Sequence, residues 1–279
     1  MFAAIFPSTC RLCRAPLANL SRLPVCDQCL ARIIPFSTSC CAVCGDQLAP
    51  DSEFMAVEIC ANCYLERPQF TRAVSYAGYT AQLRELIHLF KYHQVRPAAG
   101  VLGRMLAQAA QALLADYAQR ADRSEAQAIY VIPVPLYAGK FRERGFNQSE
   151  LIARAAIKQL SRQSGYSNEG ANGLPAVRLE LLTTVLLRRR ATASQVGMSR
   201  EERLENIRGA FAVAGKQQIA GREVLLVDDV VTTGATVSEC ARVLLSAGAK
   251  AVYVATVARA LHESSGLASY REEAKELRE

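Results

Sequence analysis

The sequence predicts an α/β protein: a parallel sheet with helices on both faces, preceded by a small cysteine-rich unit. Three observations predict it. Nine of the ten cysteines lie at or before residue 63. After residue 68, strand and helix patterns alternate, which is typical of a parallel sheet with helical crossovers. One predicted strand, 224–227, is an unbroken apolar run, as expected of a strand buried on both faces.

Composition excludes several classes of protein. The chain has 279 residues, of which 51% are hydrophobic and 21% charged, and this excludes collagen, a coiled coil and a mostly disordered chain. No uncharged apolar run reaches the roughly 18 residues that a membrane span requires, so no membrane span is expected. The apolar start MFAAIF has no basic flank, so we expect no signal peptide and a cytoplasmic location.

Charge is unevenly distributed along the chain. Residues 1–67 hold 5 Lys and Arg against 6 Asp and Glu, whereas residues 68–279 hold 28 against 20. The excess of positive charge in the larger part suggests an anionic partner such as a phosphate compound or nucleic acid. Net charge alone favours a simpler interpretation, a solvated basic surface.

Eight cysteines form four CxxC pairs. Two thiolates three positions apart can hold one metal ion from a tight turn, and two such pairs complete a tetrahedral zinc site without an open position. The pairs therefore predict two structural zinc sites, each made by neighbouring pairs. The expected ligands are Cys10, Cys13, Cys26 and Cys29 for one site, and Cys41, Cys44, Cys60 and Cys63 for the other. Cys40 is an alternative to Cys41.

Disulfides are the alternative interpretation of these cysteines, but they require an oxidising compartment. The N-terminal segment 1–67 is too short to have much core of its own, and zinc binding can supply its folding energy. We expect a double zinc ribbon over residues 1–67 and an α/β domain over 68–279, divided before Pro68. Because the ribbon segment is slightly acidic, a docking or hood role is as well supported as contact with DNA.

The order of elements in the larger domain follows from apolar periodicity and turn residues. We expect strands at 72–79, 129–134, 182–187, 224–227 and 253–257. We expect helices at 82–93, 99–120, 148–161, 199–206 and 236–247. Residues 164–175 are a Gly/Ser/Asn-rich loop, and the charged tail 270–279 is expected to be a solvated helix end.

The segment VLLVDDVVTTGAT, residues 224–236, carries the most chemical information. Asp228 and Asp229 follow the buried strand at its carboxyl end, where α/β sheets bind ligands. The next residues offer hydroxyls, backbone N–H groups and a helix N-terminus, which suit a phosphate dianion. Paired carboxylates can accept hydrogen bonds from ribose hydroxyls or hold Mg²⁺ through water. The segment therefore predicts a site for a sugar phosphate.

Other nucleotide and hydrolase motifs are absent from the sequence. It contains no G-x-x-x-x-G-K-[ST], no H-E-x-x-H and no G-x-S-x-G, and no G-x-G-x-x-G follows a strand. A capped strand–turn–helix would explain one carboxylate but not two followed by a Thr-Thr-Gly-Ala-Thr turn.

The segment VLLVDDVVTTGAT resembles the motif with which type I phosphoribosyltransferases bind 5-phosphoribosyl-1-pyrophosphate (PRPP). The resemblance implies that Asp228 and Asp229 bind the ribose hydroxyls, with Mg²⁺ bound alongside PRPP. It implies that the turn wraps the 5-phosphate through Thr232, Thr233, Gly234, Ala235 and Thr236.

Two further segments and the double zinc ribbon narrow the resemblance to the ComF/GntX group of phosphoribosyltransferase-like proteins. The segments are IPVPLYAGKFRERGFNQSELIARA (132–155) and RRRATASQVGMSREERLENIRGAF (188–211). The first implies a pyrophosphate loop near Pro135 to Lys140, with Arg144 close by. The second implies a mobile loop that closes over PRPP, with Arg203 as its best candidate contact.

The ComF/GntX group is linked to natural competence, the uptake or processing of transforming DNA. The resemblance therefore implies a PRPP-binding protein of the competence machinery, with phosphoribosyl transfer to an acceptor that the sequence does not name. A non-catalytic factor that binds single-stranded DNA or a protein partner, and a regulator that senses PRPP, are the alternatives.

Overall fold

The computed structural model describes residues 9–17, 22–36, 40–48, 59–120, 128–162, 177–193 and 198–261. The predicted loop at 164–175 and the predicted tail at 270–279 lie outside these residues.

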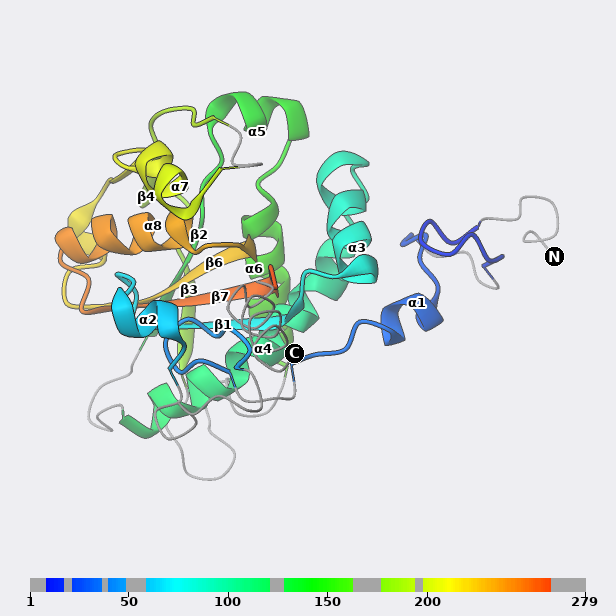
Figure 1. The fold of residues 1–279 in the computed structure, drawn as a ribbon, viewed down its shortest axis with the longest axis horizontal. Coiled ribbons are helices and arrows are strands. Elements are labelled where there is room, and N and C mark those ends of the chain that lie inside the picture. Colours follow the sequence, from blue (N-terminus) through cyan, green and yellow to red (C-terminus); the bar gives the residue numbers. More distant parts are fainter. Residues whose placement is uncertain are drawn as a thin grey trace, which may run out of the picture.

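Five parallel strands form the central sheet, in the spatial order β1-β7-β6-β2-β3 (Figure 1). Their bounds are β1 (Arg72–Gly78), β2 (Ala128–Pro133), β3 (Arg178–Leu181), β6 (Glu223–Val231) and β7 (Ala251–Arg259). Side chains of successive residues point to opposite faces of a strand, and both faces of β6 are covered: Leu225 joins one core cluster and Leu226 the other. The predicted parallel α/β fold is confirmed.

One face of the sheet is covered by three helices, α3 (Ala81–Tyr92), α4 (Ala98–Arg120) and α6 (Gln148–Leu160). Helix α4 is long and apolar enough to cross a membrane by length and composition alone, but half of the relevant window is buried inside the protein. It packs against α6, β1 and β7, as a core helix does.

The other face is covered by α8 (Ala235–Ser246) together with the second cysteine-rich unit. A two-stranded sheet, β4 (Leu186–Arg188) and β5 (Phe211–Val213), contributes to the same core cluster, next to α7 (Arg200–Ile207) and a short 3₁₀ turn at Lys216–Gln218.

The prediction of one strand at 182–187 is wrong. Leu179 and Leu181 of β3 pack on the α6 side of the sheet, whereas Val185 and Leu186 belong to the core on the α8 side. The exposed Thr183 and Thr184 turn the chain between them. The stretch 178–188 therefore forms two short strands, β3 and β4, whose apolar side chains enter the cores on opposite faces of the sheet.

Strand β6 is longer than predicted, because its neighbour β7 continues beside it. Val227 pairs with Pro133 at the end of β2, but Asp228 still pairs with Thr256 and Val230 with Ala258. The two acids therefore lie beyond the end of β2 and beside β7, inside the last part of the strand.

The segment after β2 also differs from expectation. The basic stretch predicted as a loop is partly helical, α5 (Ala138–Arg144), and Gly145 ends it in the left-handed region at φ +73°. Only residues 134–137 connect β2 to this helix.

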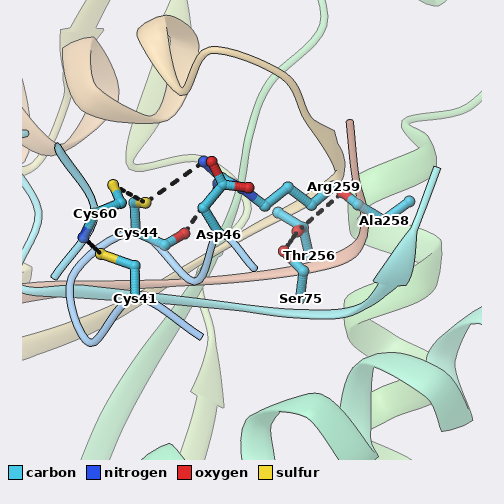
Figure 2. Close-up of polar contacts among 8 residues, drawn as sticks. All are labelled: Cys41, Cys44, Asp46, Cys60, Ser75, Thr256, Ala258 and Arg259. Atoms are coloured by element: carbon cyan, nitrogen blue, oxygen red, sulfur yellow. Dashed lines mark hydrogen bonds and ion pairs between the residues drawn. The ribbon is translucent and has the colours of Figure 1, made fainter. Parts of the chain in front are cut away.

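The second cysteine-rich unit, which includes α2 (Ala61–Leu65), is docked on the sheet. The Ala73 N–H donates to the Val43 carbonyl over 2.7 Å. A Cβ atom on Gly45 would lie 2.7 Å from the Ala73 carbonyl oxygen, so only glycine permits this approach. Figure 2 shows Arg259 at the end of β7 reaching Cys44 and Asp46 of the unit. The division before Pro68 stays a prediction, since the second unit shares its core with the sheet.

The first cysteine-rich unit, which includes α1 (Asp27–Ala31), lies at the edge of the molecule beside α3 (Figure 1). Its buried residues Cys10, Cys29 and Ile33 belong to the same core cluster as α3.

Candidate functional site

Two carboxylates in different environments lie at the carboxyl end of β6. The Ser149 hydroxyl, from the first turn of α6, donates to Asp228 Oδ1 over 2.9 Å, and the Asp229 backbone N–H donates to the same oxygen over 2.9 Å. Asp229 is buried, and its Oδ2 lies 2.7 Å from Lys91 Nζ. At the end of β6, two neighbouring carboxylates therefore share one lysine.

Lys91 is a site residue that the sequence analysis missed. It lies in the last turn of α3, with its side chain only 17% exposed. A signal was present, because Leu83, Ile87 and Lys91 are spaced four apart and share one face of the helix. A lysine on a buried stripe requires a partner, and Asp229 is that partner.

The surroundings set the protonation of these groups. Burial and then repulsion by Asp229 raise the pKa of Asp228, Lys91 and the Ser149 hydrogen bond oppose the rise, and the net result is a pKa of about 7. Burial alone would lower the pKa of Lys91, but attraction and hydrogen bonding to Asp229 leave it above its ordinary value. Lys91 is therefore charged at neutral pH, while Asp228 takes up a proton at a higher pH than an ordinary aspartate does.

The turn after β6 leads directly into α8. Gly234 precedes the helix at φ +82°, a conformation that favours glycine. A cavity of about 260 Å³ lies between this turn and the acid pair. Its lining includes Tyr79 and Lys91 as well as predicted residues. These are Asp228, Asp229, Thr232, Gly234, Ala235 and Thr236.

Arg203, the predicted PRPP contact of the segment 188–211, lies next to the turn. Its Nη1 donates to Thr232 Oγ1 over 3.1 Å, and its Nε donates to the Met198 carbonyl over 3.0 Å. The capping box of α7, formed by Ser199 and Glu202, fixes the helix that carries it.

Arg144 approaches the site without lining the cavity. It is buried, its Nη1 donates to Gln148 Oε1 over 2.9 Å, and its charge acts against that of Lys91. Arg188, at the end of β4, is another cation close enough to Asp228 to interact with it electrostatically. Cations from α3, α5, α7 and β4 therefore surround the acid pair and the turn.

Five predicted residues do not line the cavity: Arg144 and Arg203, described above, and Thr233, Lys140 and Pro135. Thr233 lines a separate cleft of about 570 Å³ between α8, α7 and the second cysteine-rich unit. Lys140 is exposed on α5, and Pro135 is half-buried in the connection after β2. Asn147 anchors that connection, because its Nδ2 donates to the Val134 carbonyl over 3.1 Å while its Oδ1 caps α6.

The cysteines form two four-sulfur groups: Cys10, Cys13, Cys26 and Cys29, and Cys41, Cys44, Cys60 and Cys63. In a tetrahedral site with Zn–S bonds of about 2.3 Å, sulfurs lie about 3.8 Å apart. The Cys13–Cys26 and Cys44–Cys60 sulfurs are 3.6 Å apart, and the Cys10–Cys29 sulfurs 3.9 Å.

These four-sulfur groups therefore fit structural zinc. Cys41 rather than Cys40 completes the second group.

Two family models match parts of the chain. Residues 148–273 match the model of the phosphoribosyl transferase domain, and residues 1–64 match the model of the double zinc ribbon domain.

Similar proteins cover nearly the whole chain. The DNA utilization protein YhgH of Salmonella typhimurium is 33% identical over 258 residues, which is 91% of this chain and 98% of that protein. Competence protein F of Haemophilus influenzae is 30% identical over 256 residues, with the same shares of the two chains. Among solved structures, a hypoxanthine phosphoribosyltransferase from Staphylococcus aureus covers 57% of this chain and 64% of its own, at 11% identity and a TM-score of 0.30.

Proposed function

We propose, since the chain belongs to the phosphoribosyltransferase-like family of competence protein F and the DNA utilization proteins, that it binds PRPP together with Mg²⁺ at the end of β6. The acid pair beside the phosphate-type turn carries the proposal. Asp228 and Asp229 stand next to a turn with hydroxyls, backbone N–H groups and the N-terminus of α8, all around one cavity.

Charge supports a ligand with phosphate at both ends. Arg203 contacts the turn through Thr232, whereas Lys91, paired with Asp229, and the nearby Arg144 form a second group of cations. A ribose between them would present its hydroxyls to the carboxylates, since charge-assisted hydrogen bonds of this kind are among the stronger ones.

The acid pair suits a hydrated Mg²⁺. Two carboxylates share one lysine, and burial together with repulsion by Asp229 raises the pKa of Asp228. Carboxylate oxygens are the ligands that Mg²⁺ prefers. When bound, Mg²⁺ would supply charge neutralisation to the pyrophosphate group.

Transfer of the phosphoribosyl group is the reaction that this arrangement suits. A nucleophile would attack C1 of the ribose, the C1–O bond would break, and pyrophosphate would leave with the electron pair. Lys91 and Arg144 would orient and stabilise the departing charge, while Asp228 and Asp229 hold the ribose. Positioning and electrostatic stabilisation would supply most of the catalysis.

The names of the relatives support a role in handling DNA. Transfer of the phosphoribosyl group to an acceptor and regulation by bound PRPP are both compatible with such a role. A cytoplasmic location agrees with PRPP as the ligand.

Isothermal calorimetry with PRPP and Mg²⁺ tests the proposal. We expect saturable binding to the wild type. Lys91→Met should weaken it about tenfold or more, because Asp229 loses its counter-ion and the pyrophosphate loses a cation. Lys158→Met, which removes an exposed lysine from α6, is the matched control and should bind like the wild type.

Absence of binding to the wild type would overturn the proposal. Binding followed by pyrophosphate release with a base or DNA acceptor would favour the transferase, whereas binding without turnover would favour a non-catalytic binding factor or a PRPP-sensing regulator.

A further inference from the structure

Three consecutive polar residues at the beginning of α6 each contact a different part of the candidate site. Asn147 precedes the helix, and Gln148 and Ser149 are its first two residues. Gln148 is 6% exposed and Ser149 is 0% exposed. Buried polar side chains require hydrogen-bond partners, and here the partners belong to the site. We call these three residues, together with Phe146 before them, the α6 start.

The Ser149 hydroxyl holds Asp228 in one orientation. It donates to Asp228 Oδ1 over 2.9 Å, and the Asp229 backbone N–H donates to the same oxygen. The helix itself gains nothing from the hydroxyl, because alanine at this position has the higher helix propensity. Since two donors occupy Oδ1, the carboxylate cannot rotate freely, and Oδ2 is left for a ligand.

Asn147 holds the connection after β2 while it caps α6. Its Oδ1 accepts from the Ser149 backbone N–H, and its Nδ2 donates to the Val134 carbonyl over 3.1 Å. The Val134 N–H in turn donates to the Val227 carbonyl of β6 over 2.8 Å. Serine caps helices equally well, but a single hydroxyl would replace the separate acceptor and donor of the amide. The beginning of the predicted pyrophosphate connection is therefore held beside β6.

Packing fixes the α6 start against the rest of the site. Phe146 is buried, and its ring centre lies 5.2 Å from that of Phe90 in α3. Phe90 precedes Lys91, the cation beside the acid pair. Gln148 Oε1 accepts a hydrogen bond from the Arg144 guanidinium of α5 over 2.9 Å. The α6 start therefore contacts α3, α5, the connection after β2 and the end of β6.

We propose that the α6 start positions the two halves of the phosphoribosyl site relative to one another: Ser149 holds the ribose-binding acid and Asn147 holds the pyrophosphate connection. The inference rests on the proposed function, which assigns these parts to the ribose and the pyrophosphate. In the described structure neither residue lines the cavity, so both are positioning residues. Their effect on binding and transfer follows from geometry, because small misplacements of reacting groups are costly.

The test is calorimetry with PRPP and Mg²⁺, repeated with ribose 5-phosphate as a competitor. Ribose 5-phosphate has the ribose and 5-phosphate of PRPP but no pyrophosphate. Ser149→Ala should weaken both ligands about tenfold, because the Asp228 carboxylate loses one of the two donors that orient it. Asn147→Ser should weaken PRPP by a similar factor and leave ribose 5-phosphate unchanged. A merely structural role of the helix would weaken both ligands in both variants.

Two further variants separate the hydrogen bond from packing. Ser149→Cys fills the space of the serine but donates only weakly, so it should bind like Ser149→Ala. Ser161→Ala removes an exposed hydroxyl from the other end of α6 and is the matched control, which should bind like the wild type. Melting temperatures of all variants identify any that does not fold.

Wild-type affinity in either folded Ser149 variant would overturn the inference and leave the proposed function intact. Equal losses of both ligands in Asn147→Ser would do the same, as would a failure of ribose 5-phosphate to compete in the wild type. A wild-type protein that binds no PRPP would instead overturn the proposed function, and this inference with it.

Discussion

Two ion pairs of low exposure join distant parts of this chain, Arg259 with Asp46 and Lys91 with Asp229. Arg259 is satisfied from several sides: its Nε donates to Asp46 Oδ1 over 3.1 Å and its Nη1 to the Cys44 carbonyl over 2.9 Å (Figure 2). Its Nη2 also lies 3.5 Å from Cys44 Sγ. This pair fastens the second zinc ribbon to the end of β7.

The Lys91–Asp229 pair differs in its charge balance. Asp228 stands beside it with no cation of its own at ion-pair distance in the described structure, and its pKa is raised to about 7. The Arg259 pair is complete within the protein, whereas the Lys91 pair keeps an excess of negative charge that a ligand would balance. The two pairs are therefore similarly buried but differ in charge balance, because only the Lys91 pair has a second carboxylate beside it.

Removal of zinc should destabilise the protein more than any single substitution. It would also disturb the Arg259 pair, because Arg259 contacts Cys44 of the second four-sulfur group, whereas the Lys91 pair does not depend on a cysteine. Metal analysis should find about two zinc ions per chain, and a chelator should lower the melting temperature strongly, since structural zinc contributes on the order of 10 kcal/mol. Zinc-free protein with mapped disulfides would contradict this prediction.

Arg259→Met should be the next most damaging change. It leaves Asp46 without its partner, and breaking a buried pair costs about 3–5 kcal/mol. The measurement is the free energy of unfolding in denaturant. Arg242→Met, which breaks the more exposed pair with Glu239, should cost about 1 kcal/mol or less. Equal losses in the two variants would show that the Arg259 contacts do not fasten the ribbon.

Asp228→Asn should stabilise the protein, in contrast to changes at the Arg259 pair. Asparagine keeps an acceptor for Ser149 and the Asp229 N–H but removes the charge. Because the pKa of Asp228 is raised from 3.8 to about 7 in the fold, ionisation destabilises the native state as pH rises through that interval. We expect a gain of about 1–2 kcal/mol at pH 8 that shrinks towards pH 4. Thermal melts across pH that show a pH-independent difference would contradict it.

PRPP binding should release a proton from Asp228 below neutral pH. The affinity should rise about tenfold between pH 6 and 8 and level off above the pKa of about 7. Calorimetry in two buffers of different ionisation enthalpy measures the proton directly. The same binding enthalpy in both buffers at pH 6.5 would show that PRPP binding releases no proton, and it would contradict this prediction.

The sequence predicted those parts of the site that are contiguous in the chain. The acid pair, the turn and both cysteine sets lie in short segments whose chemistry is local. Lys91 comes from a helix more than a hundred residues before Asp229, so only its place on the apolar stripe of α3 signalled it. The prediction of one strand at 182–187 was wrong because it, too, depended on tertiary packing. An apolar run does not show on which face of the sheet each of its residues is buried.

The most direct test of the central claim is calorimetry of PRPP and Mg²⁺ on the Asp228→Asn, Asp229→Asn double variant. Each charged hydrogen bond is worth roughly 1.5–3 kcal/mol, so we expect binding to weaken by about a hundredfold or more. Asp229→Asn leaves Lys91 without its partner, but Asp228→Asn removes an uncompensated charge beside it, so we expect the melting temperature to fall only modestly. Equal affinity in wild type and variant, or a collapsed melting temperature, would contradict a ligand site at the end of β6.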